Sequence, residues 1–243
     1  NYGGIPVLID INESAGNIAS KKISEEYAVD CIFYNCDITN EISVKNTVNS
    51  IINEIGPING LLNNAAKNEK MEDNTNIPDH RLENISLETW NRDINISLTG
   101  ALLCSRIIGK HMAENKGGVI LNISSDLGVI SPDQRIYRQD GLEENMQNVK
   151  PITYSAAKWA VVGMTKYLSV YFAQRGIRVN CLSPTGVYNN HPEDFVKKLS
   201  NIIPMGRMAD IDEYKGAIVF LCSDASSYMT GHNLVVDGGM TAW

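Results

Sequence analysis

The chain has 243 residues, of which 43% are hydrophobic and 20% are charged, values typical of a globular protein that buries a substantial core. Its formal net charge of -7 and its pI near 5.1 argue against nucleic acid as the main partner. No stretch approaches the ~20 apolar residues of a membrane span, and no signal peptide is visible. We therefore expect residues 1–243 to form a single domain without a membrane partner.

The five cysteines predict neither a disulfide framework nor a metal site. Cys31, Cys104, Cys181 and Cys222 lie in apolar runs, and Cys36 ends one. None forms a C-x-x-C pair of the kind that binds metals. We expect buried, reduced thiols, no bound metal and a cytoplasmic location.

Apolar runs and helical patterns alternate along the chain. The runs predict buried strands at 5–10, 31–34, 58–62, 119–123, 177–182 and 234–236. Helices are expected at about 14–27, 41–55, 86–115, 154–174 and 210–222, and long irregular loops at about 67–84 and 127–152. Thr39 or Asn40 can cap the second helix. This alternation predicts an α/β, Rossmann-like, doubly wound parallel sheet with helices on both faces.

Polar or turn residues follow the ends of several predicted strands. They are Asp10, Asp37, Asn63, Ser125 and Pro184. In a parallel sheet of this kind, ligands bind at the carboxyl ends of the strands. The sequence therefore predicts a binding site along this one rim.

Tyr154 and Lys158 stand four residues apart, so on a helix they share one face. A tyrosine hydroxyl has an ordinary pKa of about 10. At roughly 5 Å, and with an effective dielectric constant of about 20, a lysine ammonium would favour the phenolate by ~3 kcal/mol, or about two pKa units. That shift would bring Tyr154 toward the range of a general acid–base catalyst. Taken alone, the pair could equally be an ordinary surface pair on a helix.

The chain resembles the short-chain dehydrogenase/reductase family, in its compact single-domain branch, from about Val7 to its end. The motifs that carry the resemblance, in chain order, are Asp10, Cys36-Asp37-Ile38-Thr39, Asn63-Asn64-Ala65-Ala66, Asn95, Asn122-Ile123-Ser124-Ser125, Tyr154-x-x-x-Lys158, Arg178-Val179-Asn180, Ser183-Pro184 and Val236-Asp237-Gly238-Gly239. This similarity implies an oxidoreductase that transfers hydride between a nicotinamide cofactor and a carbon bearing a hydroxyl or carbonyl oxygen.

The resemblance also implies a catalytic set of four residues: Asn95, Ser125, Tyr154 and Lys158. Tyr154 would exchange the proton with the substrate hydroxyl, and Ser125 would hydrogen-bond the same oxygen. Lys158 would lower the pKa of Tyr154 and bind the nicotinamide ribose, while Asn95 would hold a water for proton relay. Taken singly, Ser125 could be a helix cap and Asn95 could bond the local backbone.

Asp10 is the residue that chooses the cofactor, because a carboxylate there accepts hydrogen bonds from the ribose hydroxyls and repels a 2′-phosphate. NAD is therefore favoured over NADP. The resemblance places further residues along the cofactor: Ile11, Asp37, Ile38, Asn64, Ala65, Ala66, Tyr154, Lys158, Pro184, Val187 and Asn189. For Ile11 and Ile38, the alternative is plain core packing.

Two features depart from the family pattern. The first strand and the glycine-rich pyrophosphate loop would precede Asn1, and Gly3-Gly4 is not that loop because it precedes the second family strand. We expect the sequence to lack one strand, turn and helix, about 30 residues on the scale of the motif, which would leave a break in the sheet. The second departure is Pro184-Thr185-Gly186 where relatives have Pro-Gly, with Asn189 at the usual threonine position.

The segment between Ser125 and Tyr154 is more than twice as long as in relatives of this branch and should form a loop over the active site. Its polar residues, with His191 from a second loop, are candidate substrate contacts: Arg135, Arg138, Gln139 and His191. They suit a hydroxyl-rich or phosphorylated substrate. The alternatives are an exposed structural or oligomer loop and a surface histidine.

The long loops and the chain end resemble bacterial dehydrogenases of flagellin and surface-glycan sugar pathways, including the flagellin-modification protein A group. That similarity predicts NAD-dependent oxidation of a secondary alcohol of a sugar or sugar phosphate. A sugar-nucleotide epimerase or dehydratase is one alternative, and a non-catalytic dinucleotide-binding scaffold or redox sensor is another. Members of the family are commonly tetramers, so a homo-oligomer, either a dimer or a tetramer, is expected.

Overall fold

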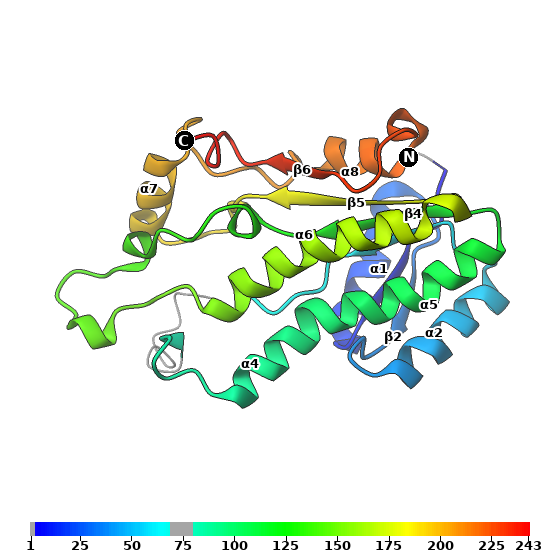
Figure 1. The fold of residues 1–243 in the computed structure, drawn as a ribbon, viewed down its shortest axis with the longest axis horizontal. Helices are drawn as coiled ribbons and strands as arrows, with labels where there is room; N and C mark the ends of the chain where they lie inside the picture. The colour runs from blue at the N-terminus through cyan, green and yellow to red at the C-terminus, as the bar shows by residue number, and fades with distance from the viewer. Residues whose placement is uncertain (1–2, 69–79) are drawn as a thin grey trace.

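The computed structural model describes residues 3–68 and 80–243, and within them every paired strand is parallel (Figure 1). The strands are β1 (Val7–Asp10), β2 (Ile32–Asn35), β3 (Gly60–Asn63), β4 (Gly118–Ile123), β5 (Ile177–Pro184) and β6 (Asn233–Val236). They confirm the six predicted strands, with ends that shift by up to a few residues.

The helices are α1 (Glu13–Tyr27), α2 (Glu41–Glu54), α4 (Leu87–Ile94), α5 (Gly100–Glu114), α6 (Ile152–Phe172), α7 (Glu193–Ile202) and α8 (Lys215–Cys222). The side chain of Asn40, not that of Thr39, caps α2 by accepting from two backbone amides. The sequence-based prediction omits α7 and begins α8 too early, at 210. Residues 69–79 of the predicted loop at 67–84 lie outside the described part of the chain.

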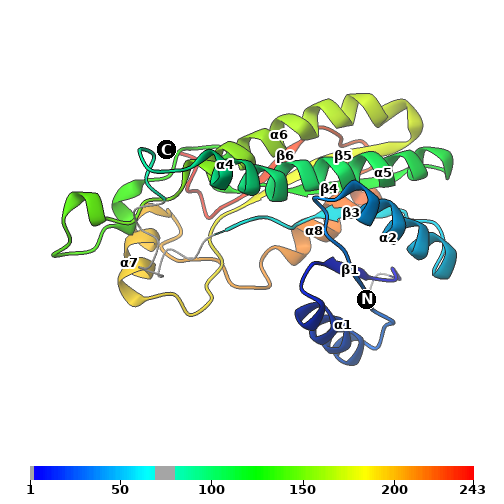
Figure 2. The same cartoon turned by 90° about the horizontal axis from the view of Figure 1, so that it is seen from below.

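The strands form two sheets. One has the order β1-β2, and the other has the order β3-β4-β5-β6. The sheet break expected from the sequence is thus observed between β1 and β3, and Leu62 on β3 is 45% exposed. In Figure 2, β1 and α1 lie apart from the layer that contains α4, α5 and α6.

Adjacent residues of β4 point to opposite faces of the larger sheet, as the two-residue period of a strand requires. Ile120 packs with Ile108 of α5 and Phe172 of α6 on one face. Leu121 packs with Leu221 of α8 on the other. Because both faces are covered, the interior strands are held rigidly and can position the residues that follow their carboxyl ends.

All five cysteines are free. Cys36, Cys104 and Cys181 are buried, as the sequence predicts. The same prediction is wrong for Cys222, which is exposed at the end of α8.

Candidate active site

Ser125 lies just beyond β4 and begins the short 3-10 turn Asp126–Gly128, here η2. Its Oγ accepts a hydrogen bond from the backbone amide of Leu127 at 3.2 Å. The neighbouring Ser124 Oγ donates to the carbonyl of Lys158 at 2.8 Å, which fastens the strand end to α6. Gly128 permits this close approach, since a Cβ there would lie 2.9 Å from the Lys158 backbone. Ser125 is therefore both the predicted cap and a residue of the site.

Tyr154 and Lys158 lie in the first turns of α6, with the Lys158 Nζ 5.6 Å from the centre of the tyrosine ring. Lys158 is 5% exposed and donates to the carbonyl of Ile123 at 2.9 Å. Desolvation lowers its pKa to about 8. Sequence and structure thus agree that α6 brings the pair together.

The expected lowering of the Tyr154 pKa by Lys158 is not observed. Desolvation raises the pKa of Tyr154 above its usual value, a hydrogen bond with Ser125 opposes this rise, and the negative charge of Asp126 adds to it. The burial that brings Lys158 close also weakens its hold on its own proton. In this structure Tyr154 is therefore a protonated hydroxyl near neutral pH, the form that donates a proton.

Asn95 begins a π-helical turn, η1 (Asn95–Thr99), between α4 and α5. Its carbonyl accepts from the amide of Gly100, five residues on, and this replaces the usual i+4 bond. The turn contacts α6, the helix that carries Tyr154, and Asn95 itself is exposed to solvent. Its predicted role in a water relay stays a prediction.

The predicted cofactor residues fall into two groups. Asp10 ends β1 and Ile11 follows it, and Asp37 and Ile38 lie just beyond β2. Pro184 and Val187 line the cavity near Tyr154. Asn189 lines the same cavity, and Asn64, Ala65 and Ala66 lie in the coil after β3. The residues that line this cavity do not include Asp10, Ile11, Asp37 or Ile38.

The adenosine end of the site keeps acceptor capacity for a ribose. Asp10 is exposed, and one of its oxygens accepts from the amide of Asn12 at 2.8 Å, so the carboxylate can still accept from ribose hydroxyls. Ile11 is 68% exposed, so the core-packing alternative is wrong for it. Ile38 does pack against the core, and Asp37 accepts two bonds from Thr39.

A nicotinamide dinucleotide has three parts to be bound: the adenosine, the pyrophosphate and the nicotinamide riboside. The residues present fit the adenosine and the nicotinamide riboside. Asp10 suits the adenosine ribose, and the Lys158 ammonium with the cavity wall suits the nicotinamide riboside. Within residues 3–68 and 80–243, no glycine-rich turn follows a strand in the place of a pyrophosphate loop.

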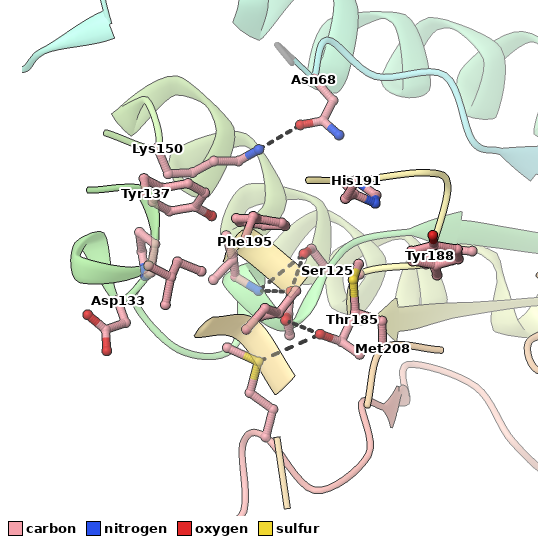
Figure 3. A pocket seen from close by; sticks show the side chains of 18 of the residues that line it. Asn68, Ser125, Asp133, Tyr137, Lys150, Thr185, Tyr188, His191, Phe195 and Met208 are labelled. Carbon is pink, nitrogen blue, oxygen red and sulfur yellow. Dashed lines mark hydrogen bonds between the residues drawn. The ribbon is translucent and has the colours of Figure 1, made fainter. Parts of the chain in front are cut away.

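A cavity of about 850 Å³ opens beside Ser125 (Figure 3). Tyr154 also lines this cavity. As expected, the insert between those residues lines it, through the 3-10 turn Gln134–Tyr137, here η3, and through Lys150. The Lys150 Nζ donates to Asn68 at 2.6 Å and lies 4.1 Å from the centre of the Tyr154 ring. The insert is therefore a wall of the site and not a detached surface loop.

The two predicted substrate arginines are held by carboxylates. Arg135 has an 85% exposed side chain that binds Asp133, and it does not line this cavity, so its assignment as a substrate contact stays a prediction. Arg138 does line the cavity, but its guanidinium binds Glu144. In each case a carboxylate close in the sequence captures the guanidinium.

Gln139 and His191 both line the cavity, in agreement with the sequence-based expectation. The Gln139 amide donates to Gln147 Oε1 at 2.8 Å, so the backbone of Gln139 is tied within the insert. His191 Nδ1 accepts from the Asn189 amide at 3.2 Å, and its ring lies 5.6 Å from that of Phe195 on α7. His191 is thus part of an aromatic wall.

Sequence reasoning missed Asp126, Tyr137 and Thr185 as residues of the site. Asp126 is buried, and its carboxylate accepts from Ser125 Oγ at 2.5 Å and from Thr185 Oγ1 at 2.7 Å. The sequence carried two signals for these residues. Asp126 directly follows Ser125, and Thr185 is an unusual residue in the turn after β5. Tyr137 lines the cavity and stacks on Phe195, a contact with no sequence signal.

Neither a metal cluster nor a membrane helix is found in the part of the chain that the structure describes. Within those residues, no three or more His, Cys, Asp or Glu side chains gather to hold a metal ion. In the same residues, no helix is both long and apolar enough to span a bilayer.

The parallel fold and the Ser125, Tyr154 and Lys158 geometry agree with a family comparison. A family model described as "Enoyl-(Acyl carrier protein) reductase" matches residues 2–241. The chain therefore belongs to the short-chain dehydrogenase/reductase family, whose members are oxidoreductases.

The chain is similar to several characterised dehydrogenases. It is 33% identical to a D-threitol dehydrogenase of Mycolicibacterium smegmatis, over 85% of this chain and 72% of that protein. It is 31% identical to an NADP-dependent mannitol dehydrogenase of Alternaria alternata (90% and 75% covered) and 29% identical to an NAD-dependent glycerol dehydrogenase of Listeria innocua (98% and 85% covered).

Among solved structures, a short-chain type dehydrogenase/reductase from Mycobacterium marinum superimposes with a TM-score of 0.83. The two chains are 26% identical, and 99% of this chain and 86% of that one are covered.

Proposed function

We propose that the protein oxidises a secondary hydroxyl of a neutral polyol or sugar to a ketone, with NAD as the hydride acceptor. The observation that carries this proposal is the meeting of Ser125, Tyr154 and Lys158 beside a cavity of about 850 Å³. In size and in its mixture of polar and apolar walls, that cavity suits a small ligand.

The proton and the hydride leave the substrate by different routes. In the oxidising direction, Tyr154 must first lose its proton and then accept the proton of the substrate hydroxyl. Ser125 fixes that oxygen by a hydrogen bond, and Lys158 is close enough to stabilise the phenolate. A bound nicotinamide supplies the acceptor for the hydride from the same carbon. In the reducing direction, Tyr154 returns the proton.

Neutral substrates are favoured over phosphorylated ones by the carboxylate of Asp126 beside Ser125. Asp126 contacts Ser125 directly and would repel an anionic group near the reacting carbon. The guanidinium of Arg138 is bound by Glu144. The relatives named for D-threitol, mannitol and glycerol support a hydroxyl-rich substrate.

NAD is proposed over NADP because of Asp10. Its exposed carboxylate lies at the carboxyl end of β1, where it would accept from ribose hydroxyls and repel a 2′-phosphate. The relatives include both NAD-dependent and NADP-dependent enzymes, so this preference rests on Asp10 alone.

The finer biological assignments rest on the resemblance described from the sequence. They are a role in surface-glycan or flagellin-glycan synthesis, a cytoplasmic location and a homo-oligomer. A non-catalytic scaffold is the alternative function, and the assembled Ser125 and Tyr154 favour the enzyme over it.

The proposal is tested by assaying the protein with NAD and with NADP against three substrate panels. These are neutral polyols (D-threitol, mannitol and glycerol), phosphorylated hexoses, and hydrophobic alcohols with their ketones. We expect kcat/KM for the best neutral polyol to exceed that for every phosphorylated hexose by at least about tenfold, which is about 1.4 kcal/mol of transition-state binding. Turnover of the hydrophobic panel alone would sink the polyol assignment, and no turnover with measurable NAD binding would favour the scaffold.

A further inference from the structure

Tyr137 places a phenol ring in the wall of the cavity. It ends η3, on the insert between Ser125 and Tyr154, and it lines the same cavity as those two residues. Its ring stacks on that of Phe195 from α7, with the ring centres 5.8 Å apart and the planes 28° apart. Figure 3 shows the Tyr137 side chain directed toward the interior of the cavity. The mechanism proposed above gives this phenol no role.

The position of Tyr137 is fixed by contacts between η3 and α7. The preceding residue, Ile136, is 8% exposed and packs in one cluster with Leu199 of α7. On the other side, the Lys198 Nζ donates to the carbonyl of Arg138 at 2.7 Å. Together with the ring stack, these contacts hold both neighbours of Tyr137. Its hydroxyl is therefore preorganised, and a ligand would not have to order it.

The hydroxyl of Tyr137 is a donor without a protein partner. Among residues 3–68 and 80–243 it forms no hydrogen bond, although the side chain is half-buried. Burial raises the pKa of Tyr137, so the hydroxyl keeps its proton near neutral pH. A ligand that displaces water from the cavity must offer this donor an acceptor, or leave it unpaired at a cost in free energy.

The phenol also lies within electrostatic range of the reacting groups. The charge of Asp126, which contacts Ser125, and the ionised form of Tyr154 both raise the pKa of Tyr137 further. The turn after β4, the start of α6 and the insert each bring one of these groups to the same cavity. A ligand held by Ser125 and Tyr154 therefore has the Tyr137 hydroxyl near the rest of its carbon skeleton.

We propose that Tyr137 is a specificity-determining residue whose hydroxyl binds a second hydroxyl of the substrate, so that diols and higher polyols bind better than alcohols with one hydroxyl. One substrate hydroxyl contacts Ser125 and Tyr154 and is oxidised, and another accepts from Tyr137. A site built to hydrogen-bond a substrate group rejects an analogue that lacks it, because the donor is then left unpaired. The inference deepens the proposed function, because it rests on a substrate hydroxyl binding beside Ser125 and Tyr154.

The experiment compares cyclohexanol with cyclohexane-1,2-diol, which share a ring and differ by one hydroxyl. Each is titrated into the protein saturated with NADH, so that neither can be oxidised, and the cis and trans diols are titrated separately. The quantity compared is the dissociation constant of cyclohexanol divided by that of the tighter diol. Tyr137→Phe removes only the hydroxyl and keeps the ring that stacks on Phe195.

Tyr188→Phe is the matched control, since it removes the same group from another tyrosine of the cavity wall. Tyr188 is 49% exposed, so water can still solvate its hydroxyl when a ligand is bound. Loss of that hydroxyl should therefore not discriminate between the two rings.

We expect the wild type to bind the tighter diol at least about fivefold more tightly than cyclohexanol, which is about 1 kcal/mol, and Tyr137→Phe to bring the ratio close to one. The affinity for cyclohexanol should not fall in Tyr137→Phe, because no hydroxyl is then left unpaired. Tyr188→Phe should keep the wild-type ratio. A wild type that binds neither diol more tightly than cyclohexanol, an unchanged ratio in Tyr137→Phe, or an equal fall in Tyr188→Phe would overturn the proposal. The result is distinct from the polyol assignment, because that assignment is tested by turnover and this experiment measures binding alone.

Discussion

Replacing Lys158 with methionine should change how the stability of the cofactor-free protein depends on pH. Burial lowers the pKa of Lys158 from 10.5 to about 8. Between these values the unfolded chain binds the proton that the folded chain has released, so the free energy of unfolding rises with pH at about 1.4 kcal/mol per unit. Below pH ~8 both states are protonated, and the full desolvation penalty of about 3 kcal/mol is present.

The size of the stability change follows from the pH range between the two pKa values of Lys158. From about pH 7 to about pH 9.5, the wild type should regain about 2 kcal/mol that the Lys158→Met protein, lacking the group, cannot. Both proteins are unfolded in urea at each pH, and the difference between their free energies of unfolding is plotted against pH. The pH dependence contributed by the other titratable groups cancels in this difference. The loss of the hydrogen bond to Ile123 shifts the difference by the same amount at every pH, so it does not change the slope. A flat difference would refute the assignment of Lys158 as a buried, easily deprotonated ammonium.

Further predictions concern the cofactor, the start of α6 and one turn. Asp10→Ala should raise the kcat/KM ratio of NADP to NAD at least about tenfold, because the carboxylate no longer repels a 2′-phosphate; an unchanged ratio in steady-state assays would remove Asp10 from its role. Thr153→Val breaks a 2.9 Å bond to the buried Asp93 and should cost about 1–3 kcal/mol in urea unfolding, whereas Thr153→Ser should recover most of it. Gly117→Ala places a Cβ 2.2 Å from a backbone oxygen at a φ of 87° and should lower stability by more than about 3 kcal/mol. Gly141→Ala, at a φ of 82° with open space around it, should cost only about 1–2 kcal/mol, and equal losses would show that the clash is not the cause.

The sequence was sufficient for the rim of the sheet and for the central pair. Apolar runs ended by polar residues placed Ser125 and Pro184 beyond neighbouring strands, and the structure pairs β4 with β5 in parallel. The four-residue spacing of Tyr154 and Lys158 required only a helix, which α6 provides.

The electrostatics of the site could not be predicted in the same way. The pKa of Tyr154 depends on how much water is excluded and on the charge of Asp126, and both are set by tertiary packing. The sequence shows a nearby lysine but not that its burial lowers its own pKa. The sign of the shift was therefore predicted wrongly although the contact was predicted correctly.

The ion pairs of the insert between Ser125 and Tyr154 also could not be predicted from the sequence. Arg135 and Arg138 counted as available cations in the sequence, whereas Asp133 and Glu144 bind them in the folded insert. Irregular segments lack the period that tells which side chains share a face, so such pairs are hard to foresee. α7 had a readable pattern, because Phe195, Leu199 and Ile202 recur at helical spacing and pack in one cluster.

The most direct test of the central claim is turnover by Tyr154→Phe. With NAD and the best neutral polyol from the substrate screen, we expect kcat to fall by at least about 100-fold, since the proton acceptor is gone. The dissociation constant of NAD, measured by calorimetry, should change less than about twofold, because one hydroxyl of an extended cofactor site is removed. Turnover comparable to that of the wild type would contradict the account and would show that another group carries the proton.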